Sequence, residues 1–249
     1  MHAFKVIFCS FAFFLFCSSS DIHAATIREL YEQAVDAYNQ GQYDHAVELY
    51  KKITKISPNF APAYVGIGLS LKSKGADIDE VMYYYKIATE MDPTNAQAFE
   101  QLGRLYYSLN NFNKAEKNFL KVLSIDPTVV SAKSSLAWIY LLAMSKPETA
   151  IRYFREVLKE SAAPNIYFGL GMAYFANNNR IQAMDMITAL RKMGQEDFAQ
   201  RLEQMVRENK KVVLQQEDNS PEDPPSASTT VPADTGIKVR LRGKLSDAD

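Results

Sequence analysis

The chain has 249 residues, of which 47% are hydrophobic and 23% are charged, and its formal net charge is −1. This is enough chain for one domain of ordinary size, or for two small ones, with an apolar core. The near-zero charge excludes an overall field that would attract nucleic acid or an anionic membrane. Ten glycines and ten prolines are too few for a collagen-like or wholly disordered chain.

The first 24 residues have the pattern of a secretory signal peptide. Lys5 precedes an uncharged apolar run over Val6–Cys17, and small and polar residues follow that run. As a helix, this run would span about 18 Å, short of the roughly 30 Å of hydrocarbon in a bilayer, so a stable membrane span is not expected. We predict cleavage after Ala24 or Ala25 and export to a bacterial periplasm, with a secreted or envelope-associated protein as the alternatives.

Reactive residues are scarce beyond this segment. Both cysteines, Cys9 and Cys17, lie inside it, so the mature chain would have no thiol for a disulfide, a nucleophile or a zinc site. His45 would be the sole imidazole, and no G-x-S-x-G motif accompanies it. Asp77, Asp79 and Glu80 lack the calcium-loop pattern and are explained better by a stretched loop or by the start of a helix. We expect no cofactor, no metal and no enzymatic activity; the remote alternative, an enzyme, would need a pocket of carboxylates and hydroxyls.

Four columns of residues recur with a shared step of about 34 residues. Such agreement between independent columns indicates an internal repeat. Each unit shows apolar residues at the i, i+3, i+4 and i+7 spacing of two amphipathic helices. The aromatic or apolar column comprises Tyr50, Tyr85, Phe119, Phe154 and Ile187; the small-residue columns comprise Ala46, Val81, Ala115, Ala150 and Ala183, and then Gly68, Gly103, Ala137 and Gly171; the proline column comprises Pro58, Pro93 and Pro127.

At these columns the chain resembles the tetratricopeptide repeat family, most clearly over Ala96–Val129. The resemblance implies an all-α fold: an α-solenoid in which about five helix hairpins form a right-handed superhelix and a C-terminal helix caps the stack. We expect this domain at residues 25–209. Its repeats are predicted at residues 27–60, 61–95, 96–129, 130–163 and 164–196, and its capping helix at residues 197–209.

The physical chemistry of the repeat at residues 96–129 agrees with this interpretation. The small residues Gly103 and Ala115 are expected where two helix backbones approach closely. Asn110 is expected in the turn between the two helices, because asparagine tolerates the left-handed backbone that such turns need. Pro127 cannot continue a helix and is predicted to end the unit.

The resemblance also implies that the first helices of successive repeats line a concave groove, which would bind a protein or peptide partner. The residues at these positions are unusually apolar and aromatic, as is typical of interaction surfaces, and we expect Trp138 to be the main anchor. The alternative is that the stack curls tightly, or the cap folds back, and buries the last of them. The sequence therefore predicts a non-catalytic adaptor of the cell envelope. The predicted groove residues are Tyr31, Val35, Tyr38, Val65, Leu69, Arg104, Tyr107, Trp138, Leu141, Phe168, Met172 and Phe175.

The helical period fades over residues 210–249. Gln215–Asp234 is rich in acids, Ser, Thr and Pro and is predicted to be a disordered linker, whereas Gly236–Leu245 alternates apolar and basic residues as a half-exposed strand does. Three interpretations stay open: the strand-like segment adds to the edge of a partner's sheet while the repeats serve as scaffold, the tail occupies the chain's own groove until a client displaces it, or the tail is inert. The predicted docking residues are Ile237, Lys238, Val239, Arg240, Leu241 and Arg242.

Overall fold

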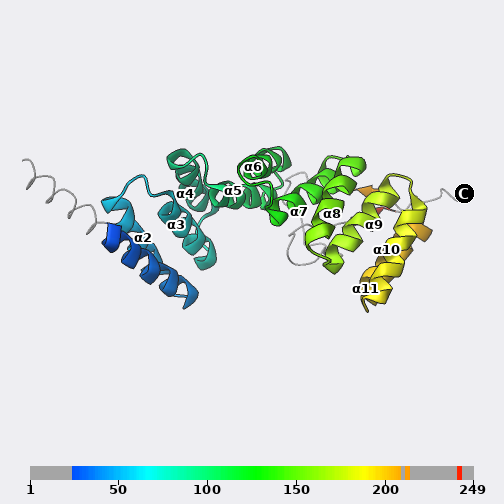
Figure 1. Cartoon of the computed structure of the whole chain (residues 1–249), viewed down its shortest axis with the longest axis horizontal. Coiled ribbons are helices and arrows are strands. Elements are labelled where there is room, and N and C mark those ends of the chain that lie inside the picture. The colour runs from blue at the N-terminus through cyan, green and yellow to red at the C-terminus, as the bar shows by residue number, and fades with distance from the viewer. Residues whose placement is uncertain (1–23, 209–210, 214–239, 243–249) are drawn as a thin grey trace, which may run out of the picture. The chain divides into compact units, whose positions relative to one another are not determined.

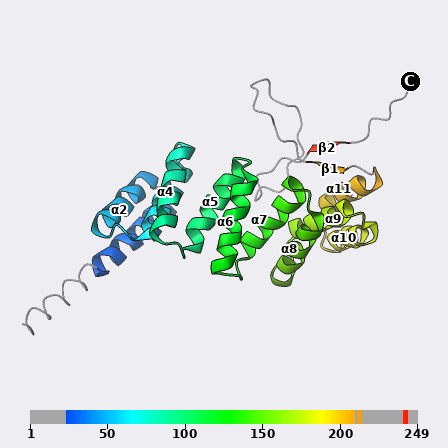
Figure 2. The ribbon, with the colours of Figure 1, turned by 90° about the horizontal axis from the view of Figure 1, so that it is seen from above.

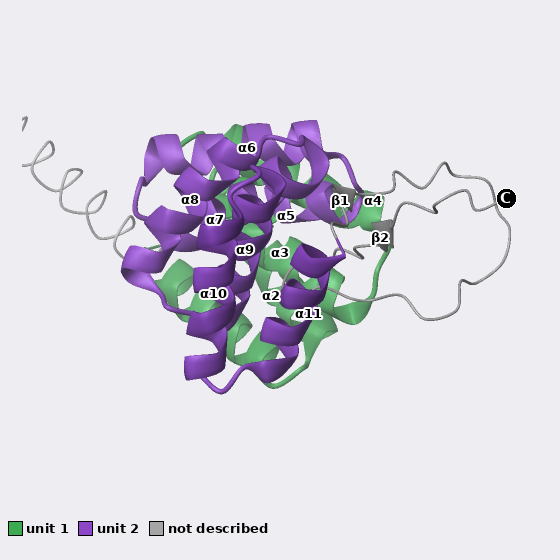
Figure 3. Cartoon of the chain, turned by 90° about the vertical axis from the view of Figure 1, so that its right-hand side faces the viewer, with its two compact units in different colours: residues 1–102 green, residues 103–249 purple. Residues whose placement is uncertain are grey.

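The computed structural model describes residues 24–208, 211–213 and 240–242, so the predicted signal peptide lies almost wholly outside the described residues. The chain forms two compact units, residues 1–102 and residues 103–249 (Figure 3). The boundary between the units falls inside one helix, α5 (Ala96–Ser108). Among the described residues, no helix combines the length and the apolar character that crossing a membrane requires.

Unit 1 consists of successive helices joined by short turns, with α3 packed against both α2 and α4 (Figure 1). Each helix has an apolar side that its neighbours cover, as the repeat pattern of the sequence requires. The elements of unit 1 are a helix at residues 24–39, α2 (Tyr43–Ile56), α3 (Ala61–Lys74), α4 (Ile78–Met91) and the first half of α5.

Unit 2 continues the same pattern, and each helix from α6 to α11 packs against the next. Two three-residue strands pair antiparallel, and the first of them lies against α9 (Figure 2). The predicted all-α fold class is confirmed, and these strands are the only departure from it in the described residues. The elements are α6 (Phe112–Ile125), α7 (Val130–Trp138), the π-helical turn η1 (Ile139–Ala143), α8 (Pro147–Glu160), α9 (Pro164–Ala176), α10 (Arg180–Lys192), α11 (Glu196–Arg207), β1 (Lys211–Val213) and β2 (Arg240–Arg242).

The turns inside four of the five predicted repeats share one hydrogen-bond pattern. Asn110 has a φ of 56°, in the left-handed region, and the Asn111 N–H donates to the carbonyl of Tyr106, five residues back, at 2.8 Å. The same bond to the carbonyl five residues back closes the turns at Gly41 and Asn178, which also have positive φ. Glycine and asparagine are the residues that tolerate this backbone, so the prediction for Asn110 is confirmed.

Glycines on the first helices make room for aromatic rings of the second helices. A Cβ atom built on Gly68 would lie 2.4 Å from Cε1 of Tyr85. The corresponding distance from Gly103 to Cε1 of Phe119 is 3.1 Å. We expected two backbones to approach closely at Gly103, and the structure instead places an aromatic ring against it. The glycine and aromatic columns of the sequence therefore match each other residue by residue.

One repeat takes up an extra residue inside its first helix. After α7, the Met144 N–H donates to the carbonyl of Ile139, five residues back, at 3.0 Å, which is the π-helical bond of η1. The turn that follows is closed by the Lys146 N–H and the carbonyl of Tyr140, six residues back, at 2.7 Å. The small-residue columns of the two helices are accordingly 13 residues apart here and 12 apart in the preceding repeat. The π-helical turn absorbs the additional residue.

Candidate functional site

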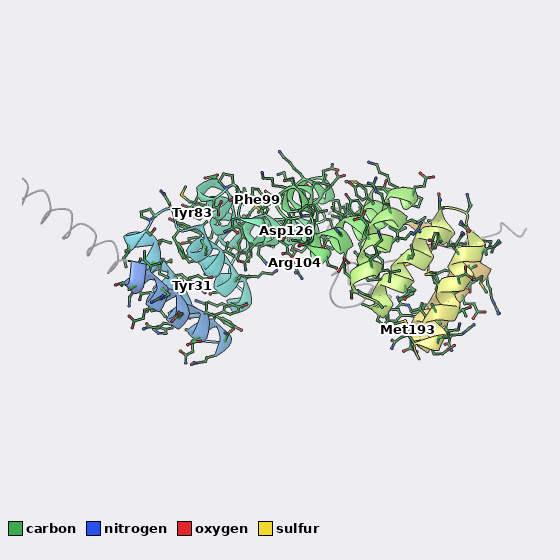
Figure 4. The ribbon with its side chains drawn as sticks, viewed as in Figure 1. Tyr31, Tyr83, Phe99, Arg104, Asp126 and Met193 are labelled. Carbon is green, nitrogen blue, oxygen red and sulfur yellow. The ribbon has the colours of Figure 1, made fainter. Side chains whose placement is uncertain are left out.

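Four of the predicted groove residues form one partly exposed face of unit 1. Tyr31, Val35 and Tyr38 lie on the helix at residues 24–39, and Leu69 lies on α3; all four are partly buried. Spacings of four and three residues place the first three on the same side of their helix. We call these four residues the unit 1 face, and Figure 4 labels Tyr31 within it.

Contacts made by tyrosines join the two helices that carry the unit 1 face. The hydroxyls of Tyr38 and Ser73 lie 3.0 Å apart, and Ser73 is one helical turn beyond Leu69 on α3. At the other end, Tyr31 meets Phe60 edge-on, with 5.7 Å between ring centroids, and Phe60 immediately precedes α3. The helix at residues 24–39 therefore runs beside α3, which brings the four side chains to one surface.

Tyr50 of α2 lies behind this face. Its ring centroid is 5.7 Å from that of Tyr31, and a Cβ atom built on Gly66 would lie 2.4 Å from its Cζ atom. Burial, and then the nearby Tyr31 and Tyr38 hydroxyls, raise the pKa of Tyr50 to about 12. Its hydroxyl stays protonated at neutral pH and adds no negative charge behind an aromatic surface.

Val65 does not join the unit 1 face. Its side chain is 2% exposed and packs in a core cluster with Ala88 of α4 and Ala98 of α5, and Leu69 packs against the outside of that cluster. The expectation that Val65 is exposed on a groove is wrong, because its side chain packs between neighbouring helices.

Arg104 and Tyr107 lie in the half of α5 that belongs to unit 2. Arg104 is exposed, and Tyr107 is partly buried beside Phe112, with 5.8 Å between ring centroids. Burial raises the pKa of Tyr107, and its hydroxyl oxygen is enclosed without a hydrogen-bond partner in the described part of the chain. An enclosed, unpaired hydroxyl carries a free-energy cost that a hydrogen bond from a bound water or partner would recover.

Trp138 is fully buried, so the expectation that it is an exposed anchor is wrong. Its ring meets Phe154 edge-on, and a Cβ atom built on Gly169 of α9 would lie 2.9 Å from its Cη2 atom. The glycine of the next repeat thus leaves the space that the indole fills. Leu141, in η1, is likewise buried, with 3% of its surface exposed. Both residues stabilise unit 2 and are not accessible to a partner.

The three predicted groove residues of α9, Phe168, Met172 and Phe175, are also buried, each at most 8% exposed. The capping helix α11 covers part of this surface. Phe198 lies 5.3 Å from Phe168 between ring centroids, and the guanidinium of Arg201 lies 5.3 Å above the same ring. The expected exposure of these residues is therefore wrong, and the alternative, in which the cap folds back over the last repeat, describes the structure.

Polar contacts fix α11 to α10. Arg191 pairs with Glu203 and with Glu196 of α11, and Arg180 donates a hydrogen bond to the carbonyl of Val206 near the end of that helix. The hydrogen bond from Arg191 is the main reason that the pKa of Glu203 is lowered. These contacts hold the cap over α9.

The predicted docking segment of the tail is described only at Arg240–Arg242, where it forms β2. Ile237, Lys238 and Val239 lie outside the described residues. β2 pairs with β1 of the same chain, so the described part of this segment already has a strand partner. Whether it docks to another protein stays a prediction.

A stack of aromatic and basic side chains on unit 2 was missed at the level of sequence. The rings of Tyr140 and Tyr153 lie nearly parallel, 5.6 Å apart, with Lys146 above the first ring and Arg152 above the second. Burial, and then a hydrogen bond to Glu116, raise the pKa of Tyr140. The signal available in the sequence was the extra residue of this repeat, which indicated that its helices differ from those of the preceding repeat. A neighbouring depression of about 400 Å³ is lined by Glu148, Ile151, Arg152, Arg155, Glu156 and Lys159.

The described residues offer little for catalysis or metal binding. His45 is exposed, and its Nδ1 lies 4.0 Å from a carboxylate oxygen of Glu48. Of the two explanations offered for Asp77, Asp79 and Glu80, the helix start is confirmed, since Asp77 precedes α4 and its carboxylate accepts a hydrogen bond from the N–H of Asp79 at 2.8 Å. Within the part of the chain that the structure describes, no group of three or more His, Cys, Asp or Glu side chains is placed to hold a metal ion.

Comparison with known families agrees with the paired helices. Three models of the tetratricopeptide repeat match the chain, at residues 27–60, 96–129 and 136–182. The chain contains tetratricopeptide repeats. Two of the three matches coincide with predicted repeats, and the third spans η1, α8 and α9. Stacked tetratricopeptide repeats serve as scaffolds that present binding surfaces to other proteins.

The similar proteins fall into two groups: curated relatives that are much longer than this chain, and solved structures that the match covers almost completely. The chain is 25% identical to anaphase-promoting complex subunit CDC16 of Saccharomyces cerevisiae over 154 residues, which cover 59% of this chain and 18% of that protein. It thus spans less than a fifth of that relative's length. Among solved structures, MamA has a TM-score of 0.58 at 17% identity, covering 81% of this chain and 100% of that one. YrrB, a TPR protein with an unusual peptide-binding site, has a TM-score of 0.61 at 17% identity, covering 70% and 90%.

Proposed function

We propose that this chain is a non-catalytic adaptor of the cell envelope that binds a partner polypeptide through its tetratricopeptide repeats. The unit 1 face is the observation that carries the proposal. Its two tyrosines and two aliphatic residues are partly exposed on two adjacent helices, whereas the corresponding residues of α7, η1 and α9 are buried. The peptide-binding site reported for YrrB belongs to that protein and supports the proposal through the shared repeat fold.

The chemistry of the unit 1 face favours an apolar segment of the partner. Tyr31 and Tyr38 offer large, rigid rings at a low cost in side-chain entropy, and Val35 and Leu69 add aliphatic surface between them. The hydroxyl of Tyr38 is already within hydrogen-bond distance of Ser73, so its orientation is fixed before binding. We therefore expect the partner to contribute aliphatic or aromatic side chains, in an extended or helical segment.

The envelope location rests on the pattern of the first 24 residues. A fusion of residues 1–30 to a reporter enzyme that is active only after export tests it. We expect activity and a processed N-terminus after residue 24 or 25. Retention of an unprocessed fusion inside the cell would contradict the location and would leave the binding proposal intact.

A capture experiment with matched variants tests the binding proposal. Val35→Asp places a charge in the unit 1 face, and Tyr83→Asp places one at a tyrosine on α4 that is 59% exposed and lies outside that face. Burying an unpaired carboxylate in an interface is costly, so we expect Val35→Asp to reduce capture of the partner from an envelope extract by about tenfold or more. Tyr83→Asp should capture the same polypeptide as the native chain. Equal capture by both variants would refute the site.

A further inference from the structure

The exposed side of α8 carries a row of positive charges. Arg152, Arg155 and Lys159 are spaced by three and four residues, which places them on one side of the helix, and all three are exposed. The buried residues Phe154 and Val157 belong to the other side, which packs against α7 and α9. At the helical rise of 1.5 Å per residue, the row extends over about 10 Å. We call these three residues the α8 cations.

The α8 cations line the depression of about 400 Å³ described above, together with Ile151. Ile151 is partly buried, so it adds a small apolar surface between the charged side chains. The depression thus combines positive charge with one apolar contact on a single rigid helix.

The two acids of the depression do not neutralise the α8 cations. Glu156 is paired with Lys133 of α7, whose Nζ lies 3.5 Å from its carboxylate oxygen. Glu148 lies in the first turn of α8, where the helix dipole favours a negative charge. Within the described ranges, no ion pair joins an α8 cation to a carboxylate. The depression therefore keeps an excess of positive charge, although the chain as a whole has a net charge of −1.

An aromatic pair holds one of these cations in position. The guanidinium of Arg152 lies 5.3 Å from the ring centroid of Tyr153, and that ring stacks on Tyr140, which is 7% exposed. A cation that is fixed before binding loses less side-chain entropy when a ligand arrives. The stacked and largely covered rings do not offer the open aromatic platform on which the bases of single-stranded nucleic acids stack.

We propose that the α8 cations and Ile151 form a second docking site, which binds an acidic segment of a partner polypeptide. Its carboxylates pair with Arg152 and Arg155, whose planar guanidinium groups suit bidentate contacts with carboxylates, and an apolar side chain of the segment contacts Ile151. A polypeptide can set its acids on the cations and away from Glu148 and Glu156, whereas the flat surface of an anionic membrane would face both acids as well.

This site lies in unit 2 and does not depend on the unit 1 face. The unit 1 face suits an apolar segment, whereas the α8 cations suit an acidic one. The inference therefore goes beyond the function proposed above, because it gives the adaptor a second partner surface of different chemistry.

Labelled peptides test the inference by fluorescence anisotropy with the full chain. The probe is a peptide of repeated Gly-Glu-Leu, and the controls replace every glutamate by glutamine or by lysine. We expect the native chain to bind the glutamate peptide about tenfold more tightly than the glutamine peptide at about 50 mM NaCl, and the difference to shrink at about 300 mM. The net charge of the chain would favour the lysine peptide, so a preference for glutamate has to come from a local site.

Charge reversal locates the site. Arg152→Glu combined with Arg155→Glu should reverse the preference, so that the lysine peptide binds more tightly than the glutamate peptide. Lys52→Glu combined with Lys55→Glu is the matched control, since both lysines are exposed on α2 and have the same spacing and charge. This control should bind the glutamate peptide as the native chain does. Arg155→Glu alone leaves the contact between Arg152 and Tyr153 in place and should weaken the binding by about threefold, so the test does not depend on the fold of the double variant.

Three results would overturn the inference. They are equal binding of the glutamate and glutamine peptides by the native chain, equal loss in the two double variants, and tighter binding of vesicles of phosphatidylglycerol or of an oligothymidylate than of the glutamate peptide. Val35→Asp should leave binding of the glutamate peptide unchanged, so failure at α8 is distinguishable from failure of the unit 1 face.

Discussion

Trp138 meets Phe154 edge-on, with 5.1 Å between ring centroids and 84° between ring planes. Gly169 closes the same contact from the next repeat, since a Cβ atom there would lie 2.6 Å from Cζ of Phe154. Helices α7, α8 and α9 thus meet at two aromatic rings that pack against a glycine. Trp138, the largest side chain of the predicted groove, therefore stabilises the helix stack and is too buried to contact a partner.

The burial of Trp138 has a spectroscopic consequence, because it is the only tryptophan of the chain. We expect blue-shifted emission that acrylamide quenches poorly, both before and after partner binding. Trp138→Ala should lower the free energy of unfolding by about 3–5 kcal/mol, whereas Tyr83→Ala, on the surface, should change it by about 0.5 kcal/mol or less. Strongly quenched emission, or a tolerated alanine, would show that the indole is exposed after all.

The distances between the glycines and the aromatic rings predict how much each glycine-to-alanine substitution lowers the free energy of unfolding. Gly68→Ala forces a Cβ atom to 2.4 Å from the buried ring of Tyr85 and should destabilise the protein by about 1–3 kcal/mol. Gly103→Ala meets Phe119 at 3.1 Å, and the gain in helix propensity of about 1 kcal/mol should offset most of its cost. Urea unfolding of the two variants measures the difference. Equal effects would mean that ring clearance does not decide these positions.

The π-helical turn should tolerate removal of one residue. Deleting Ala143 from η1 would restore the 12-residue spacing of the preceding repeat, whereas deleting Ala176 at the end of α9 would shorten a repeat that has no residue to spare. We expect the first deletion to cost about 1 kcal/mol and the second to cost several times more. Thermal unfolding of both deletion variants compares them. A more harmful deletion at Ala143 would show that η1 has a structural role of its own.

Two aspartates at the ends of second helices give the stability a dependence on acid pH. Hydrogen bonds from the side chain and backbone of Thr94 lower the pKa of Asp92, and those of Thr128 lower the pKa of Asp126. Because the folded pKa lies below the unfolded value, the contribution is complete above about pH 4 and is lost as the pH falls through the folded pKa.

The variant that tests this dependence combines Thr94→Val with Thr128→Val, which removes both hydroxyl donors and leaves the carboxylates in place. Its stability should fall less than that of the native chain between pH 5 and pH 2.5, as measured by urea unfolding at each pH. Parallel loss in both proteins would assign the acid sensitivity to other carboxylates.

Much of the fold was predictable because the same residue types recur about every 34 residues in the sequence. The columns that contain Gly68, Tyr85 and Phe119 located the helix pairs, and asparagine at 110 located a turn. The spacing of 13 in place of 12 was also visible in the sequence, but only the backbone shows that η1 absorbs it. The pattern alone does not say whether an extra residue enters a turn or a helix.

The candidate site was harder to predict, because a position on a helix does not say what covers it. Trp138 and Phe168 occupy groove positions by family rule, yet Gly169 admits the first side chain and Arg201 covers the second. The absence of charged residues from α9 was a signal that most of this helix is buried, as eight of its thirteen residues are. Two of the three residues of β1 are valines, which favour strands, but so short a run is not enough to predict one from the sequence.

Photo-crosslinking from the unit 1 face tests the central claim most directly. We would place p-benzoylphenylalanine at Val35 in the full chain and, as the control, at Tyr83 on α4, and irradiate each protein in its native envelope fraction. A single polypeptide joined to position 35, absent at position 83 and lost when Leu69→Asp is added, is the result that the unit 1 face predicts. Identical crosslinking patterns from the two positions, or a crosslink at 35 that survives Leu69→Asp, would contradict it.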